Sequence, residues 1–458
     1  MLRKQPQINV PESVLTICRT LHDHGFQAYV VGGAVRDALL GKSPTDWDVT
    51  TDARPNQVEA IFPKTIPTGK QYGTITVVLN GQSVEVTTMR RDAHYSDGRR
   101  PDYVEFASDL SADLSRRDFT VNAIAYDPLT EVFYDPYKGI KDLRRKVLRT
   151  VGDPYQRFSE DALRMLRLIR FSAALDFRPD KKAIKGIQPS LIVNVANERI
   201  REELSKLLLA DSIAKPLELF YTSGLLEKII PELAATAGIN QGSNHVWDVL
   251  GHSIMACQAV KSKLHLRWGA LLHDIAKPKT FSQDEDGIHF YGHDHLGAEM
   301  AEEILRRLTY SNKIQAQVSL LIMHHMYQIH PHSSDKAFRR LIHRVGVENI
   351  YDLLELRKAD VLAMKHNPRQ VLTYYQLMRA RVEGIIAADH AFNLKDLAVT
   401  GSDLIKELNL TPGPIIGKIL DYLLDQVLDQ PELNTKTDLL TLANRYLKDN
   451  LPATDGGS

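Results

Sequence analysis

Two aspartates, Asp46 and Asp48, stand one residue apart and closely follow a glycine turn, Gly32-Gly33. Alternate residues of a strand point to one face, so the two carboxylates are expected side by side. Adjacent carboxylates repel each other unless a cation separates them, and a hard divalent ion such as Mg²⁺ suits them. Two such ions can bridge the attacking and leaving oxygens of phosphoryl-type transfer. Glu85, on a following hairpin, could add a third carboxylate.

The segments around these residues predict a small mixed sheet with flanking helices. Residues 28–31 have strand character and end in the glycine turn, where backbone N–H groups can approach an anion closely. Residues 34–40 then open a helix. Further strands are expected at 46–50, 75–79 and 83–88, because of their alternation and β-branched content. Asn80-Gly81 between the last two predicts a hairpin.

A second group of polar residues repeats every three positions: Asp161, Arg164, Arg167 and Arg170. On a single predicted helix they would share one broad face. A carboxylate accepts hydrogen bonds and a guanidinium donates them, which together complement the Watson–Crick edge of a base. The alternative interpretation is an exposed, ion-paired helix.

A third group collects imidazole and carboxylate ligands from several predicted helices of the second half. Such ligands suit a divalent transition metal with open positions for water. Any one of these histidines could instead be an ordinary core or surface residue. The candidates are His252, His273, Asp274 and Asp360, with His293 and His325 as further ligands.

Long motifs of the first half carry a family resemblance. The segment from Val31 through the glycine turn to Thr50 resembles the first motif of the class II tRNA nucleotidyltransferase and bacterial poly(A) polymerase superfamily. Residues 116–123 resemble its second motif, 159–171 its base-reading motif and 87–102 its flexible loop. Weaker similarity runs from Gly413 to the end.

This resemblance implies an activity and roles for individual residues. The chain is expected to add CCA to the 3′ end of tRNA from CTP and ATP, without a nucleic-acid template. Gly33 and Arg36 would contact the nucleotide, Arg117 its triphosphate and Asp118 its ribose hydroxyl, while Asp46 and Asp48 would hold Mg²⁺. The helix with Asp161 and the three arginines would select the base.

The order of histidines and aspartates in the second half resembles the HD phosphohydrolase superfamily. His252, His273, Asp274 and Asp360 match its basic quartet, and His293 and His325 match positions that two-metal members use. The resemblance implies a Ni, Mn or Zn site acting on phosphoesters, including 2′,3′-cyclic phosphates at RNA ends. Lys277, just after the His-Asp pair, fits a site that handles phosphates.

Composition sets the broad class. The 458 residues carry 57 Lys+Arg and 57 Asp+Glu, so RNA would have to meet a local basic surface rather than a basic protein. The 2 cysteines exclude a disulfide framework. We find neither a signal peptide nor an apolar run of the ~20 residues that span a bilayer, so a cytoplasmic protein without membrane contact is expected. No protein partner can be inferred.

Together these patterns predict an α+β chain with a small mixed-sheet head followed by helical parts. The expected domains are a nucleotidyltransferase head (1–145), a helical neck with the base-reading helix and an RNA-binding region (146–235), an HD domain (236–370) and a helical tRNA-binding tail (371–458). Two alternatives stay open. One is an enzyme that adds only A, only CC or a poly(A) tail; the other is an RNA- or nucleotide-binding module in which only the HD hydrolase is active.

Overall fold

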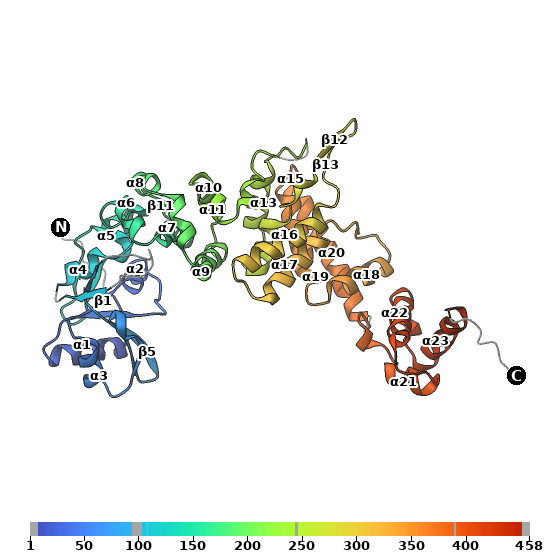
Figure 1. Cartoon of the computed structure of the whole chain (residues 1–458), viewed down its shortest axis with the longest axis horizontal. Coiled ribbons are helices and arrows are strands. Elements are labelled where there is room, and N and C mark those ends of the chain that lie inside the picture. Colours follow the sequence, from blue (N-terminus) through green and yellow to red (C-terminus); the bar gives the residue numbers. More distant parts are fainter. Residues whose placement is uncertain (1–7, 94–102, 108, 243–245, 389–390, 451–458) are drawn as a thin grey trace. The chain divides into compact units, whose positions relative to one another are not determined.

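The computed structural model describes residues 8–93, 103–107, 109–242, 246–388 and 391–450. The chain divides into two compact units, Met1–Ala234 (unit 1) and Ala235–Ser458 (unit 2). Unit 1 contains a seven-stranded sheet and unit 2 is helical, so the predicted α+β class is confirmed. Figure 1 labels the elements along the chain.

The sheet of unit 1 has the strand order β3-β4-β5-β2-β1-β8-β9. Strands β2 and β5 are parallel, and the other neighbouring pairs are antiparallel, so the sheet is mixed as expected. The strands are β1 (Ala28–Val31), β2 (Asp48–Thr51), β3 (Thr65–Gly69), β4 (Thr74–Leu79), β5 (Gln82–Thr88), β8 (Ala125–Asp127) and β9 (Val132–Tyr134). Strands β6 (Arg90–Ala93) and β7 (Tyr103–Phe106) form a separate antiparallel pair.

The register of the central strands places apolar side chains on one face of the sheet and the predicted carboxylates on the other. Val30 pairs with Val49 and Val49 with Val86, and all three side chains are fully buried. The residues one step earlier on the two parallel strands, Asp48 and Glu85, also pair with each other. Because neighbouring positions on a strand face opposite sides, the valines direct these carboxylates to the other face of the sheet. The predicted hairpin is confirmed, since Asn80 and Gly81 at its turn both have positive φ.

One strand prediction was partly wrong. Strand β2 begins at Asp48, and Asp46 lies in the preceding segment with its side chain exposed. Strand β1 explains the late start: its last residue, Val31, pairs with Asp48, and the chain then turns away at Gly32. Residues 46 and 47 therefore have no partner strand on that side.

Helices cover the sheet and build the remainder of unit 1. They are α1 (Glu12–Asp23), α2 (Gly33–Leu39), α3 (Pro55–Ile61), α4 (Leu110–Ser115), α5 (Gly139–Arg145), α6 (Pro154–Glu160), α7 (Leu163–Leu175), α8 (Lys181–Lys185), α9 (Asn197–Leu208), α10 (Ala214–Thr222), α11 (Leu225–Ile229) and α12 (Pro231–Ala234). Helices α1 and α3 contact each other and the sheet (Figure 1). Two short parallel strands, β10 (Val147–Leu148) and β11 (Arg178–Pro179), join the start and end of the α6–α7 segment.

Asp161 is not on the predicted base-reading helix, which corrects the single-helix prediction. It lies in extended conformation between α6 and α7, and its Oδ1 accepts a hydrogen bond from the backbone N–H of Leu163. An aspartate side chain that bonds a nearby backbone N–H competes with continuing the preceding helix. Arg164, Arg167 and Arg170 are on α7 as expected.

Unit 2 consists of helices around a buried core. They are α13 (Val249–Ala259), α14 (Leu264–Leu272), α15 (Lys277–Thr280), α16 (His293–Arg307), α17 (Asn312–His324), α18 (Asp335–Val345), α19 (Ile350–Leu362), α20 (Pro368–Ala388), α21 (Gly401–Glu407), α22 (Pro414–Asp429) and α23 (Lys436–Asn450). Residues 275–292 contain α15 and a hairpin of β12 (Ser282–Asp284) and β13 (Gly287–His289). Among the described residues no helix is long and apolar enough to cross a membrane.

Candidate functional site

The glycine turn after β1 lies directly against two of the predicted site residues. Gly32 has φ of 76°, in the left-handed region that favours glycine. A Cβ atom added there would lie 2.9 Å from Nη1 of Arg117 and 3.4 Å from Oδ2 of Asp48. The turn therefore brings the backbone at the start of α2 close to a guanidinium and a carboxylate at once.

Two of the predicted carboxylates of the head, Asp46 and Glu85, act on the third, Asp48. Burial raises the pKa of Asp48; Arg117 lowers it, while Glu85 and Asp46 raise it further. Burial and the two like charges outweigh the one guanidinium. An all-oxygen ligand set that carries unrelieved negative charge fits Mg²⁺.

Arg117 uses only some of its hydrogen-bond donors within the described residues. Its Nη2 donates to Oδ2 of Asp113 at 3.3 Å, whereas its Nε is buried and has no hydrogen-bond partner among the described residues. Asp113 is fully buried on α4 and also accepts from Arg116. Burial alone would raise the pKa of Asp113, but the two guanidinium groups lower it. The unpaired Nε gives the site a donor for an anionic ligand.

Asp118 is the centre of a buried hydrogen-bond network. Its Oδ1 accepts from the amide of Asn122 at 2.9 Å, and its Oδ2 accepts from Nε of Arg167 at 2.8 Å. Burial would raise the pKa of Asp118, yet Arg167 and Asn122 lower it to about 2. Arg36 joins the network by donating to Asn122 at 2.7 Å, and it also bonds both oxygens of its neighbour Asp37. The network fixes α2, the 118–122 segment and α7 relative to one another.

Asp161 and Arg164, the predicted base readers, both have protein partners. Nη1 and Nη2 of Arg199, on α9, donate to the two oxygens of Asp161 at 3.2 and 2.8 Å. Nη1 of Arg164 donates to Glu160 at 2.7 Å, and its Nη2 donates to the backbone carbonyl of Arg116 at 3.2 Å. Each predicted reader thus already holds a group of the complementary hydrogen-bonding type.

The other two arginines of α7 converge on one acid. Arg167 and Arg170 donate to the two oxygens of Glu203, which is buried on α9. The guanidinium of Arg170 also lies 3.5 Å from the ring centre of Phe171. Sequence reasoning missed Glu203 and Arg199, because nothing local in α9 distinguishes them from surface charges; Asn122 lay within the second motif, without a role assigned. Of the predicted flexible loop, residues 87–102, the part from residue 94 onward lies outside the described residues.

The structure of unit 2 brings all six predicted histidine and aspartate ligands together. Within the first group, Nε2 of His252 lies 3.0 Å from Oδ1 of Asp360 and 3.7 Å from Oδ2 of Asp274. Nε2 of His273 lies 3.2 Å from the same Asp274 oxygen and 3.8 Å from Oδ1 of Asp360. These four residues come from α13, the end of α14 and α19, and all are buried.

A second group shares Asp274. Nε2 of His293 and Nε2 of His325 lie 3.5 and 3.9 Å from Oδ1 of Asp274, and 3.3 Å from each other. Asp274 therefore directs one oxygen at each group. Within the described residues, His252, His273 and Asp274 form one set of atoms spaced closely enough to hold a metal ion, and Asp274, His293 and His325 form another.

The imidazole orientations fit metal binding. Nδ1 of His273, His293 and His325 each bonds a backbone carbonyl, at 2.9, 2.7 and 2.6 Å. A ring that donates from Nδ1 presents its Nε2 lone pair to the cluster. Nε2 of His273 is buried and makes no hydrogen bond among the described residues. Burial would lower the pKa of His273, but Asp274 and Asp360 raise it to about 10.

Lys277 belongs to the same cluster. Its Nζ donates to Oδ2 of Asp274 at 2.7 Å and to the side-chain oxygen of Gln241 at 2.6 Å. The predicted phosphate-handling lysine is thus bonded to the shared carboxylate.

Three family models match parts of the chain. Residues 28–149 match the poly(A) polymerase head domain, residues 180–236 the probable RNA and SrmB-binding site of polymerase A, and residues 290–443 a putative domain 2 of tRNA nucleotidyltransferases. The first match contains the glycine turn and the carboxylates, and it ends just before α6.

Whole-length comparisons agree with these matches. The chain is 32% identical over 450 residues to the CCA-adding enzyme of Limosilactobacillus reuteri, covering 96% of this chain and 97% of that protein. It is 30% identical over 442 residues to that of Leuconostoc mesenteroides, covering 94% and 96%. The Bacillus stearothermophilus CCA-adding enzyme, solved in complex with CTP, superposes with a TM-score of 0.74 at 28% identity, over 96% of this chain and 98% of that one. With relatives of this similarity along nearly its whole length, and a head that carries the carboxylates and the glycine turn, this chain belongs to the family of CCA-adding enzymes.

Proposed function

We propose that this protein adds C, C and A to the 3′ end of tRNA, using CTP and ATP and no nucleic-acid template. The observation that carries the proposal is the convergence of Asp48, Glu85 and Arg117 at the Gly32 turn, in a chain of the CCA-adding family. The 3′-hydroxyl of the tRNA attacks the α-phosphate. A new P–O bond forms, pyrophosphate leaves, and the hydroxyl proton passes to a carboxylate or to solvent.

Each head residue has a part in this reaction. Asp46 and Asp48, with Glu85 beside them, would hold Mg²⁺, which when bound stabilises charge on the reacting oxygens. Arg117 offers its unpaired Nε to the triphosphate, and the Gly32-Gly33 backbone lets that group approach. Arg36 and Asp118 act within one network: Arg36 holds Asn122, and Asp118 accepts from the ribose hydroxyl when the nucleotide arrives.

Base selection is assigned to Asp161 and Arg164. Their acceptor and donor groups complement a base edge, and Arg167 and Arg170 position α7 through Asp118 and Glu203. Residues 180–236, in the proposed neck (146–235), match an RNA-binding family model, which supports tRNA contact there. The tail from 371 onward is the second proposed tRNA contact.

The test is incubation of the purified protein with tRNA that lacks its 3′ end and with single labelled nucleotides. CTP alone should give two additions, and ATP should be added only after them. Addition of A alone, of CC alone or of a long A tail would replace the proposal with the corresponding narrower activity. No addition at all would leave a binding module, in which the cluster of unit 2 is the only catalyst. Asp48→Ala should abolish incorporation, while Glu59→Ala, which removes a carboxylate paired with Lys70 outside the site, should not.

A second function is favoured by the cluster of unit 2. We propose that it is an HD-type metal centre, with His252, His273, Asp274 and Asp360 at one ion and Asp274, His293 and His325 at a second. The inward Nε2 atoms and the shared Asp274 support two ions over one. Imidazole ligands favour Ni²⁺, Mn²⁺ or Zn²⁺, and such ions supply activated water for phosphoester hydrolysis.

Metal content measured by mass spectrometry tests this centre independently of turnover. The wild-type chain, dialysed against Mn²⁺ or Ni²⁺, should retain more than one equivalent, His293→Ala should lose part of it and Asp274→Ala most of it. Retention by Asp274→Ala equal to that of wild type would refute the centre. Hydrolysis of 2′,3′-cyclic nucleotides should depend on the same ions.

A further inference from the structure

Asp360, a ligand of the proposed metal centre, directs its two oxygens to different partners. Oδ1 faces the cluster, 3.0 Å from Nε2 of His252 and 3.8 Å from Nε2 of His273. Oδ2 accepts a hydrogen bond at 2.7 Å from Nη1 of Arg357, which stands one helical turn earlier on α19. Asp360 therefore offers one oxygen to the cluster, and through this carboxylate Arg357 is linked to His252.

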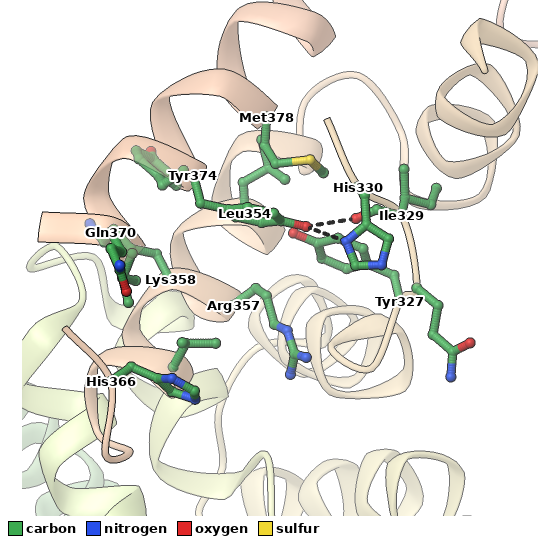
Figure 2. Close-up of a pocket in the computed structure, with 14 residues that line it drawn as sticks. Tyr327, Ile329, His330, Leu354, Arg357, Lys358, His366, Gln370, Tyr374 and Met378 are labelled. Atoms are coloured by element: carbon green, nitrogen blue, oxygen red, sulfur yellow. Dashed lines mark hydrogen bonds between the residues drawn. The ribbon is translucent and has the colours of Figure 1, made fainter. Parts of the chain in front are cut away.

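Arg357 reaches Asp360 from a cavity of about 450 Å³. The walls of the cavity come from the segment after α17, from α19 and its end, and from α20, and Figure 2 shows the guanidinium of Arg357 directed away from Tyr374. No aspartate or glutamate lines the cavity, and within the described part of the chain Arg357 forms an ion pair with Asp360 alone. The charge of Arg357 is therefore balanced by a metal-ligand carboxylate and not by a separate structural acid.

Asp274, the other carboxylate of the cluster, is arranged differently. Its Oδ1 lies 3.5 Å from Nε2 of His293, and its Oδ2 lies 3.2 Å from Nε2 of His273 while it accepts from Lys277 at 2.7 Å. Both oxygens of Asp274 thus face candidate ligands. Among the described residues, Arg357 is the group that holds a carboxylate oxygen away from the cluster.

The loss of one oxygen ligand affects hard and soft ions unequally. Mg²⁺ depends on oxygen ligands and their negative charge, whereas Ni²⁺ binds imidazole nitrogen well. The imidazoles of the cluster keep their positions whatever holds Oδ2, because backbone carbonyls orient His273, His293 and His325. The positive charge of Arg357 repels both divalent ions alike. The withheld oxygen should therefore appear as a difference between the affinities for Mg²⁺ and Ni²⁺.

We propose that Arg357 determines the metal specificity of this centre: by holding Oδ2 of Asp360, it disfavours Mg²⁺ and leaves the site to ions that bind imidazole. The inference rests on the proposed metal centre, for which it names a residue that selects the ion. Mg²⁺, the ion proposed for the head, then does not compete for the centre of unit 2.

Affinities for Mg²⁺ and Ni²⁺ are measured by calorimetry on the full-length chain. Every protein compared carries Asp48→Ala, so the head contributes the same background throughout. Arg357→Met removes the guanidinium and keeps a long, unbranched side chain. It should lower the ratio of the Mg²⁺ dissociation constant to that of Ni²⁺ at least about tenfold, the lower limit for changing an outer partner of a metal ligand.

Three further variants complete the comparison. The matched control is Arg379→Met, which removes an arginine of α20 that lies outside the cavity and pairs with Glu383, and which should leave the ratio unchanged. Arg357→Lys keeps the positive charge and a donor for Oδ2, so its ratio should return toward that of the chain with Arg357. Arg357→Ala is a second neutral replacement and should lower the ratio as Arg357→Met does.

The outcomes keep this inference apart from the metal centre. An unchanged ratio in Arg357→Met and Arg357→Ala, with Ni²⁺ still bound, overturns the role of Arg357 and leaves the metal centre standing. Equal weakening of both ions makes Arg357 a purely structural residue, which also overturns the proposal. If the chain with Arg357 intact binds neither ion, the metal centre itself is refuted, and the inference fails with it.

Discussion

At the scale of single residues, Gly32 sets the geometry of the head site. It combines a backbone conformation that disfavours side chains with the close approach of Arg117 and Asp48. Gly32 therefore meets two requirements: a positive φ for the turn, and the absence of a Cβ atom beside Arg117 and Asp48. Substitutions can separate the two requirements, because other glycines of the chain have a positive φ with open space around them.

Gly32→Ala should reduce CCA addition by about thirtyfold, because the new methyl group displaces Arg117 and so costs a charged hydrogen bond of about 2 kcal/mol. The matched control is Gly25→Ala. Gly25 has φ of 80°, against 76° for Gly32, but a Cβ there meets nothing within 4 Å. Both variants place alanine at a positive φ, so a difference between their single-turnover rates of CCA addition reports the contact of the new Cβ atom with Arg117. Equal loss of activity in the two would show that strain, not Arg117, is responsible.

Asp118 gives the head a stability that depends on pH. Its pKa falls from an ordinary 3.8 to about 2 in the folded chain, so the group stabilises the fold above pH 4 and loses this contribution as the pH falls toward 2. Asp118→Asn should therefore lower the free energy of unfolding of unit 1 by about 2 kcal/mol at pH 7. Urea unfolding at pH 7 and at pH 3 checks both parts. A difference that stays constant between the two would exclude ionisation of Asp118 as the cause.

At the scale of elements, helices α7 and α9 are joined by buried charge. Glu203 on α9 accepts from Arg167 and Arg170 on α7, and Arg199 on α9 bonds Asp161 just before α7. Breaking a buried ion pair by removing one partner leaves the other charge uncompensated. Replacing a single charged residue between α7 and α9 should therefore lower the stability of unit 1.

Glu203→Ala should destabilise unit 1 by about 1.5–3 kcal/mol, since two partly buried guanidinium groups lose a charged hydrogen-bond acceptor. Glu202→Ala removes the neighbouring carboxylate, which is exposed, and should change stability by no more than about 0.5 kcal/mol. Thermal and urea unfolding measure both. Comparable stability of the two variants would mean that the ion pairs contribute nothing net.

Some of these elements could be predicted from the sequence and others could not. The hairpin at Asn80-Gly81 and the strand before Gly32 were predictable because their signals are local. The start of β2 and the break at Asp161 were not, since one depends on where a partner strand ends and the other on a side-chain bond to the backbone N–H of Leu163. The histidines and aspartates that converge in unit 2 were predicted by their order along the chain. The two-sided use of Asp274 and the Arg357 link required coordinates, because their partners are distant in sequence.

At the scale of the whole molecule, the two proposed chemistries belong to different compact units. All head ligands lie before residue 235 and all cluster ligands after it. Their donor sets differ as well: oxygen only in the head, imidazole and carboxylate in unit 2. Metal requirements should therefore separate along the same line.

Asp274→Ala should remove most of the metal retained by unit 2, abolish hydrolysis of cyclic phosphates, and leave CCA addition with Mg²⁺ within about twofold of wild type, as expected for sites without shared partners. The measurements are metal content, phosphoester hydrolysis and tRNA extension on one preparation. Loss of tRNA extension in a well-folded variant would show that the two units depend on each other.

The pairing of Asp161 with Arg199 has a consequence for fidelity. With Asp161 in its proposed role as a base reader, a base does not enter an empty site. It must displace Arg199, which the chain holds nearby at a high effective concentration. A nucleotide with a matching edge replaces the lost bonds. A nucleotide with the wrong edge does not displace Arg199, so Asp161 keeps both hydrogen bonds to that arginine when the nucleotide dissociates. Selection then works by exchange: Asp161 is hydrogen-bonded either to Arg199 or to the correct base.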